Sequence, residues 1–295
     1  MTMAKKIFLT GSNGFIGRNI KESLGQFYNI ISPNSRDLDL LNEAAVHKFL
    51  RKNKFDVVIH CATHNATVVS DKNLSKVLQS NLRMFFNIAR CDKFFGKMFY
   101  FGSGAEFDKR CPIIKVKEID FDKKIPIDDY GFSKYIMTKY IKSTSNIYNL
   151  RLFGCFGKHE DWRIRFISNA ICRVIFDMDV TISRNVYFDY LYIEDLVKIV
   201  KCFIEMKKIR YKEYNICSGK KIDLITLAGK ILKVANKKTI IKVLRKGLKA
   251  EYTGDNTRLK AEIKNLDLLE IDDSIKKLYD WYSQNKFIID KEQIR

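Results

Sequence analysis

The feature that most constrains the fold is a glycine-rich segment near the N-terminus, where residues 6–17 read KIFLTGSNGFIG. Residues 7–9 are a short apolar run typical of a buried parallel strand, and a helical pattern follows the glycines. Gly11 permits a tight turn, Gly14 lets the backbone approach a pyrophosphate, and Gly17 lets the helix pack closely on the strand. A glycine triplet alone is often only a loop, but the order strand, turn, helix predicts a dinucleotide site. Its expected contacts are Gly11, Ser12, Asn13, Gly14, Phe15, Ile16 and Gly17.

Strand-like and helix-like patterns alternate through residue 157. We expect strands at 28–32, 56–62, 98–101 and 149–153, and helices at 18–26, 43–53 and 72–91. This alternation predicts an α/β fold, a Rossmann-type doubly wound parallel sheet with right-handed crossovers. Beyond residue 157 the alternation fades, and an amphipathic helix is expected at 163–177. We therefore predict a dinucleotide-binding domain at 1–158, completed by segments near 187–215, and a smaller C-terminal α/β substrate-binding domain at 159–295.

The composition argues against a membrane or metal protein. No apolar run in the 295 residues approaches the roughly 20 residues of a membrane span, so neither a signal peptide nor an anchor is expected. The seven cysteines are odd in number and show no C-x-x-C spacing. We therefore expect reduced cysteines, no metal site and a cytoplasmic location.

The net charge of +20 has two interpretations. The favoured one is a lysine-rich surface in solvent, and the other is a polyanionic partner such as nucleic acid or the diphosphate of a small substrate. The lysines are scattered along the chain and form no dense basic arm. We expect no nucleic-acid partner and a modest steering of anionic metabolites.

The end of the second expected strand indicates the cofactor. An acidic residue about 20 residues beyond the glycine turn normally holds the ribose hydroxyls of NAD. Here the segment 32–37 reads SPNSRD, and Arg36 stands where a 2′-phosphate could sit. This arrangement favours NADP, with NAD as the alternative cofactor. The competing interpretation is that Arg36 and Asp37 are only charged turn residues.

A Tyr-x-x-x-Lys spacing occurs three times, at 130/134, 135/139 and 282/286. Tyr130 and Lys134 follow a plausible helix start and lie in the crossover after the strand that ends near Ser103, so we select this pair. A phenol has a pKa near 10, and an ammonium within about 4–6 Å lowers that pKa. Tyr130 could then donate a proton to a carbonyl oxygen that Ser103 also hydrogen-bonds.

Several motifs together resemble the extended short-chain dehydrogenase/reductase family, the NAD-dependent epimerase/dehydratase superfamily. They are the G-x-x-G-x-x-G turn, VVIHCA at 57–62, the Tyr130/Lys134 pair, FDYLYIED at 188–195 and YNICSG at 214–219. The pattern is most similar to GDP-fucose synthases and dTDP-4-keto-6-deoxysugar reductases. A late segment at 252–259 extends the resemblance over nearly the whole chain.

This resemblance implies roles for individual residues. The catalytic set would be Ser103, Tyr130 and Lys134. Further cofactor contacts would come from Arg36, Asp39, Leu40, Cys61, Ala62, Asn81, Tyr130, Lys134 and Phe153. Substrate contacts would come from His64, Gly104, Ala105, Arg165, Arg173 and Arg258. Two positions depart from the family pattern, because Gly154 replaces a substrate-contacting asparagine and Phe188 replaces a common arginine.

The resemblance also narrows the reaction. Dehydratases of this type carry Thr-Asp-Glu where this chain has Ser103-Gly104-Ala105, so dehydration is not expected. We expect NADPH-dependent reduction of the C4 keto group of a nucleoside-diphospho-4-keto-6-deoxyhexose. GDP-fucose synthases also epimerise C3 and C5 with a cysteine and a histidine, whose positions correspond to Ala105 and Arg165, so no epimerisation is expected. The alternatives are an NAD-dependent nucleotide-sugar 4-epimerase and a non-catalytic NADP-binding regulator or RNA-binding protein.

An assembly is expected as well. The helix after Tyr130 carries Tyr135, Ile136, Tyr140 and Ile141, an apolar set of the kind that this family pairs into a two-fold homodimer.

Overall fold

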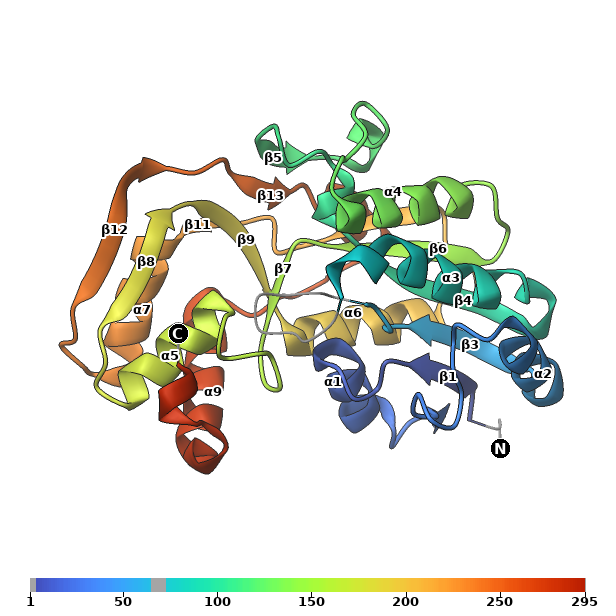
Figure 1. The fold of residues 1–295 in the computed structure, drawn as a ribbon, viewed down its shortest axis with the longest axis horizontal. Helices are drawn as coiled ribbons and strands as arrows, with labels where there is room; N and C mark the ends of the chain where they lie inside the picture. The colour runs from blue at the N-terminus through green and yellow to red at the C-terminus, as the bar shows by residue number, and fades with distance from the viewer. Residues whose placement is uncertain (1–3, 65–72, 295) are drawn as a thin grey trace. The chain divides into compact units, whose positions relative to one another are not determined.

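The computed structural model describes residues 4–64 and 73–294, and the chain divides into two compact units. The first unit comprises residues up to 110, 117–152 and 197–215, and the second comprises 111–116, 153–196 and the chain from 216 onward. Residues 111–116, 153–158 and 187–196 thus belong to the second unit, whereas the sequence grouped them with the first domain. Figure 1 labels helices and strands of both units where there is room.

The first unit is built on a six-stranded sheet in the order β10-β6-β4-β3-β1-β2. The pairs β2–β1, β1–β3, β3–β4 and β4–β6 are parallel, so the α/β fold with a doubly wound parallel sheet is confirmed. The strand order reverses direction between β1 and β3, and ligands of such sheets bind where the order reverses. The strands are β1 (Lys6–Thr10), β2 (Asn29–Ile31), β3 (Phe55–His60), β4 (Phe95–Ser103), β6 (Ile147–Leu152) and β10 (Glu213–Ile216).

Helices cover both faces of this sheet because alternate strand residues point to opposite sides. On one side, Phe8, Val58 and Met98 pack with apolar residues of α2, α3 and α4 in one buried cluster. On the other, Phe99 lies with its ring centroid 5.9 Å from that of Phe203 in α6. The helices are α1 (Phe15–Leu24), α2 (Glu43–Asn53), α3 (Val77–Ala89), α4 (Asp129–Ile141) and α6 (Ile193–Glu205), of which residues 197–205 belong to this unit.

Local sequence explains where these helices begin. The Asn42 side chain accepts a hydrogen bond from the amide of Ala45 at 3.0 Å and caps α2, and Asp128 caps α4 in the same way. Short 3-10 turns also occur, at Leu74–Lys76, Asp92–Phe94, Gly104–Glu106 (η3), Glu118–Asp120, Lys286–Ile288 and Lys291–Gln293.

The second unit contains a mixed sheet in the order β11-β9-β13-β5, with β7 paired to β9, and a separate pair of β12 and β8. Its helices α5, α7 and α9 pack against one another. The strands are β5 (Ile113–Val116), β7 (Gly154–Phe156), β8 (Val180–Asn185), β9 (Tyr187–Tyr192), β11 (Lys221–Asp223), β12 (Ile241–Leu248) and β13 (Tyr252–Gly254). The helices are α5 (Phe166–Ile175), α7 (Leu224–Ala235), α8 (Thr257–Glu262) and α9 (Ile271–Gln284).

Two details of the sequence interpretation need correction. Arg165 is the residue before α5 and not part of an expected helix at 163–177. Ile141 is fully buried in the core of the first unit, and Tyr135 is 7% exposed. These two side chains pack inside the chain because α4 contacts both the sheet and α3, so they offer no surface to a second copy. A homodimer through other residues stays a prediction.

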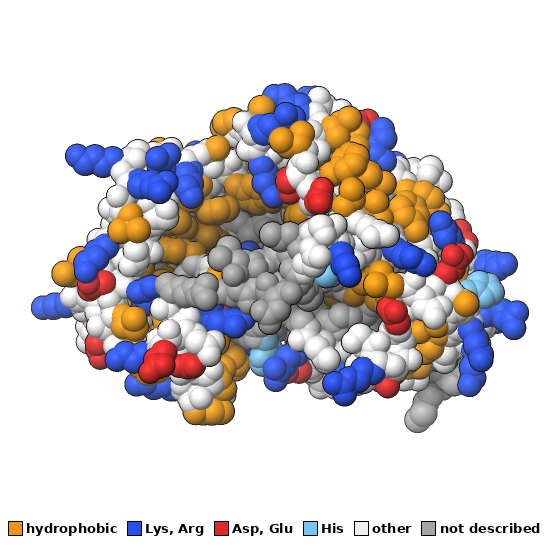
Figure 2. All heavy atoms as spheres, viewed as in Figure 1, with side chains coloured by type: hydrophobic (Ala, Val, Ile, Leu, Met, Phe, Trp, Pro, Cys, Tyr) orange, Lys and Arg blue, Asp and Glu red, His pale blue; other side chains and the backbone are white. Residues whose placement is uncertain are grey.

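The surface carries charge in a dispersed form. Figure 2 shows Lys and Arg side chains spread over the face in view, interspersed with acidic and apolar ones. In the ranges 4–64 and 73–294, no helix is both long enough and apolar enough to cross a membrane.

Candidate active site

The glycine turn forms a tight cradle between β1 and α1. Gly11 has a φ of +67°, and the amide of Gly14 donates to its carbonyl at 3.0 Å. A Cβ on Gly11 would lie 2.6 Å from the amide nitrogen of Ala62, and one on Gly17 would lie 2.2 Å from the carbonyl oxygen of Gly11. Helix α1 begins at Phe15 without a side-chain cap. Its first amides are therefore available to an anion, and the cradle fits a pyrophosphate.

A buried hydrogen-bond chain joins the ends of β1 and β3 beside this turn. The Thr10 hydroxyl lies 2.8 Å from Nδ1 of His60, and it accepts a hydrogen bond from the amide of Ala62 at 3.1 Å. Burial, with a smaller contribution from Lys134, lowers the pKa of His60 to about 3. A neutral, internally bonded imidazole acts in packing and not as a base.

The turn after β2 leaves Arg36 in solvent. The side chain of Asn34 accepts a hydrogen bond from the amide of Arg36 at 2.8 Å and shapes the turn. Among the residues that the structure describes, none pairs with the exposed Arg36 guanidinium. Nearby, the carboxylate of Asp39 accepts from the amide of Leu41, and the carbonyl of Leu40 accepts from Asn87 at 2.9 Å. Arg36 can thus reach an anionic group without losing an internal contact.

Asn81 of α3 holds the chain that leaves β3. Its side-chain oxygen accepts from the amide of His64 at 2.7 Å and from the hydroxyl of Thr63 at 3.2 Å, and its nitrogen donates to the carbonyl of His64. The His64 ring lies 3.1 Å from the carbonyl of Asn73. Burial raises the pKa of the adjacent Cys61 thiol, so this cysteine stays protonated. Asn81 therefore orients the segment 61–64 and uses its amide to do so.

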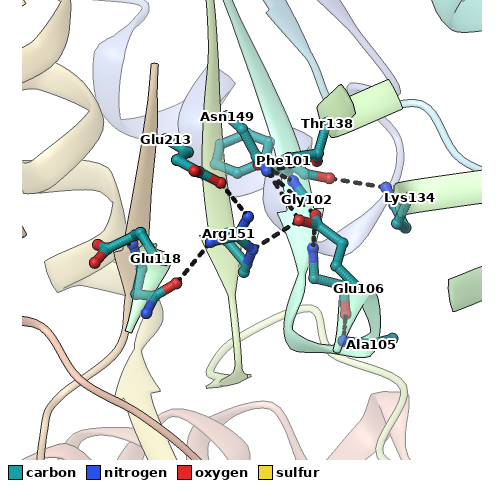
Figure 3. A network of polar contacts seen from close by, with 12 residues as sticks. Phe101, Gly102, Ala105, Glu106, Glu118, Lys134, Thr138, Asn149, Arg151 and Glu213 are labelled. Carbon is teal, nitrogen blue, oxygen red and sulfur yellow. Dashed lines mark hydrogen bonds and ion pairs between the residues drawn. The ribbon is translucent and has the colours of Figure 1, made fainter. Parts of the chain in front are cut away.

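Tyr130 and Lys134 lie one turn apart at the start of α4. Lys134 is buried, and its Nζ donates to the carbonyl of Phe101 at 2.8 Å and lies 5.6 Å from the Tyr130 ring centroid. Burial lowers the pKa of Lys134 to about 8, and Glu106 opposes that shift. Figure 3 shows the lysine reaching from α4 to the strand β4. An ammonium beside a phenol is the pairing that proton transfer from tyrosine requires.

Ser103 ends β4 and caps η3. Its hydroxyl accepts from the amide of Ala105 at 3.2 Å, and its own amide donates to the Glu106 carboxylate at 3.0 Å. Gly104 and Ala105 are buried in η3. A Cβ on Gly131 in α4 would lie 2.6 Å from the carbonyl oxygen of Ala105, so η3 and α4 are in close contact. The structure thereby brings the three predicted catalytic residues onto neighbouring elements of one unit.

The other predicted substrate contacts belong to the second unit. Arg173 on α5 is half-buried, and it donates to the side chain of Asn169 at 2.9 Å and to the carbonyl of Asp179 at 3.1 Å. Arg165 is exposed, and Arg258 lies on α8. Phe153, predicted as a cofactor contact, also belongs here, with its ring centroid 5.6 Å from that of Tyr252.

Sequence reasoning missed a buried ionic network around Glu106 and Arg151 (Figure 3). Arg151 is fully buried, and its Nε donates to Glu106 at 2.7 Å, its Nη1 to Asn215 at 3.0 Å and its Nη2 to Glu213. Asn149 donates to Glu106 from the same face of β6. The sequence did carry a signal for this network, because Asn149 and Arg151 are two polar residues at alternate positions of an otherwise apolar strand.

Comparison with known proteins places these features in context. Residues 7–217 match the model described as the NAD dependent epimerase/dehydratase family. The GDP-L-colitose synthase of Yersinia pseudotuberculosis is 23% identical over 217 residues, covering 66% of this chain and 70% of that protein. The UDP-glucose 4-epimerase of Caenorhabditis elegans is 24% identical over 237 residues, covering 70% and 68% respectively.

Among solved structures, the GDP-mannoheptose C4 reductase of Campylobacter jejuni with NADP bound has a similar fold. Its TM-score is 0.81 at 19% identity, and the match covers 96% of this chain and 99% of that one. At this identity the likeness shows the fold alone.

Proposed function

Since the chain belongs to the NAD dependent epimerase/dehydratase family, we propose that it is an NADPH-dependent reductase of the C4 keto group of a nucleoside-diphospho-4-keto-6-deoxyhexose. The membership confirms the family and the enzyme class predicted from the sequence. The family is NAD(P)-dependent, so the predicted class of cofactor is confirmed as well. The choice of NADP, the keto sugar and the direction of the reaction belong to the proposal.

The glycine cradle and Arg36 support NADPH as the cofactor. Gly11 permits the tight turn and Gly17 the close approach of α1 to it, and the first amides of α1, which no side chain caps, would face the charge of a pyrophosphate. The exposed Arg36 can pair with a 2′-phosphate, and an Asp or Glu that would hold ribose hydroxyls is replaced there. When bound, NADPH supplies the hydride for C4.

The observation that carries the proposal is the arrangement of Tyr130, Lys134 and Ser103. Lys134 is held by the carbonyl of Phe101 beside the Tyr130 ring, so its ammonium stabilises the phenolate that forms when Tyr130 gives its proton to the O4 oxygen. Ser103 hydrogen-bonds the same oxygen and polarises the carbonyl. Lys134 would also hold the nicotinamide ribose.

The substrate unit would hold the nucleotide sugar. Arg173 is the proposed diphosphate ligand, with Arg165 and Arg258 nearer the sugar and the nucleotide. His64, Gly104 and Ala105 would contact the hexose. Ala105 has no titratable group, and an arginine cannot act as a base, so C3 and C5 keep their configuration.

The direct test is NADPH oxidation with a panel of 4-keto sugar nucleotides. Tyr130→Phe should abolish turnover and leave NADPH affinity nearly unchanged, because it removes only the proton donor. Tyr135→Phe is the matched control one turn further along α4, and its hydroxyl contacts Asp122 and not the site. Loss of turnover in Tyr135→Phe with an active Tyr130→Phe would contradict the assignment.

Two further measurements separate related reactions. In deuterated water with unlabelled NADPH, the product should gain no enzyme-dependent deuterium at C3 or C5, and a gain would reveal a base. A 4-epimerase, favoured by the similarity to the UDP-glucose 4-epimerase, would interconvert two sugar nucleotides without net cofactor consumption. Net NADPH oxidation equal to product formed distinguishes the reductase.

A further inference from the structure

Glu106 is the carboxylate on which the buried network converges (Figure 3). It is fully buried and accepts from Arg151 Nε at 2.7 Å, from Asn149 Nδ2 at 3.2 Å and from the amide of Ser103 at 3.0 Å. A Cβ on Gly102 would lie 2.1 Å from its Oε1, so the strand end needs a glycine to admit this side chain. Burying a carboxylate costs desolvation free energy, and here the buried Glu106 carboxylate accepts hydrogen bonds from the three donors just named.

Glu106 acts on two of the three proposed catalytic residues. It holds the amide of Ser103, whose hydroxyl simultaneously accepts from Ala105, so the two form a reciprocal cap that fixes the end of β4. The Glu106 carboxylate also favours the ammonium form of Lys134 and so opposes the lowering of the Lys134 pKa by burial. The second carboxylate on Arg151 comes from Glu213 of β10.

We propose that Glu106 is a positioning residue for the reductase site: its carboxylate sets the orientation of Ser103 and lies at the end of β4 that the Lys134 ammonium also reaches. This inference rests on the proposed function, because it assigns Ser103 and Lys134 their roles. Arg151 and Asn149 hold Glu106 in place. Glu106 then acts on the site from η3, by binding the Ser103 amide at the end of β4 and by its charge on Lys134. Glu106 does not itself contact the substrate.

The pKa of Lys134 depends on the titratable and charged groups that face it. They come from β3 and the residue after it, from β4, from η3 and from α4 itself: His60, Cys61, Tyr100, Glu106 and Tyr130. His60 is neutral and the pKa values of Cys61 and Tyr100 are raised by burial, so these groups bring no charge near neutral pH. Among the residues that the structure describes, Glu106 is therefore the charged neighbour whose removal changes the protonation of Lys134.

The test compares Glu106→Gln with Glu213→Gln. Each variant neutralises one carboxylate on Arg151, so both should lose stability, but Glu106→Gln alone should alter Lys134. The titration of Lys134 is read by competitive labelling with trace acetic anhydride across pH, with mass spectrometry of the peptide that contains it. In the natural chain, the midpoint should lie near pH 8.

In Glu106→Gln the midpoint should move about one unit to lower pH, and the alkaline limb of kcat/KM should move with it. Glu213→Gln should titrate like the natural chain. An unmoved midpoint in a folded Glu106→Gln, or an equal shift in Glu213→Gln, would overturn the proposal. If Glu106→Gln does not fold, Glu106→Asp is the second variant, which keeps the charge on a shorter side chain. The midpoint of the Lys134 titration in Glu106→Asp should fall by a smaller amount. An unchanged midpoint together with an unchanged kcat in this variant would also overturn the proposal.

Labelling requires no substrate, so the two proposals fail separately. A shifted midpoint without reduction of any keto sugar would reject the reductase function and leave the effect of Glu106 on Lys134 in place. Reduction of a keto sugar with an unmoved midpoint would reject the role of Glu106 alone.

Discussion

Replacing Gly17 by alanine tests the cradle that the proposed cofactor site depends on. The new Cβ would lie 2.2 Å from the carbonyl oxygen of Gly11, and 3.0 Å from Cα of Ser12. Since carbon–oxygen contacts normally start at about 3.3 Å, α1 must move away from the turn by roughly 1 Å. Such overpacking costs about 1–3 kcal/mol, against a gain of up to about 1 kcal/mol from the helix propensity of alanine.

Gly229→Ala is the matched control, because Gly229 lies inside the helix α7, is exposed, and has no atom within 4 Å of an added Cβ. This variant should gain up to about 1 kcal/mol in the free energy of unfolding and bind NADPH normally. Gly17→Ala should lose stability in urea unfolding and lose at least about tenfold in NADPH affinity, or about 1.4 kcal/mol, by fluorescence titration. Stability and NADPH affinity in Gly17→Ala equal to those of the control would refute the close packing that we describe.

Three further predictions follow from single side chains. Arg36→Ala should weaken NADPH binding by about 1.5–3 kcal/mol and leave NADH nearly unaffected, whereas equal losses would make Arg36 a turn residue only. Because the pKa of His60 is about 3 when folded and about 6.5 when unfolded, the unfolded chain binds the extra proton as the pH falls below 6.5. The free energy of unfolding should therefore fall by up to about 1.4 kcal/mol for each pH unit below 6.5. Urea unfolding at several pH values between 6.5 and 5 measures this, and the free energy of unfolding should depend less steeply on pH in His60→Gln than in the natural chain. Arg173→Ala should raise KM for the sugar nucleotide, and an unchanged KM would place the diphosphate elsewhere.

The parts of the fold that could be predicted are those controlled by nearby residues. The helix α2 has the predicted bounds 43–53, because Asn42 caps it and the apolar period is regular. The glycine turn was predictable for the same reason, since the requirement for a positive φ at Gly11 is local. The start of the helix that carries Tyr130 and Lys134 was predictable because the cap at Asp128 is readable in the sequence, and the choice of Tyr130 among the three spacings stays a prediction.

The network around Arg151 could not be predicted, because it joins residues that are far apart in the sequence. Glu106, Arg151 and Glu213 meet only when η3, β6 and β10 are neighbours. The orientation of α4 was hidden for a related reason. Its apolar residues could equally face a partner, and the packing of α3 against α4 decides that Ile141 lies inside.

The pairing of β5 with β13 has a consequence for the synthesis of the chain. Ile113 of β5 lies opposite Tyr252 of β13, and the parallel ladder between them cannot form until the later strand exists. At about 5–20 residues per second, a ribosome needs roughly 7–30 s to make the intervening 140 or so residues. Throughout that interval the residues of β5 have been made but lack their partner strand β13, although the neighbouring residues of the first unit are already made. The second unit is therefore completed late, and nascent chains that stop before residue 252 would carry an unpaired strand that favours aggregation.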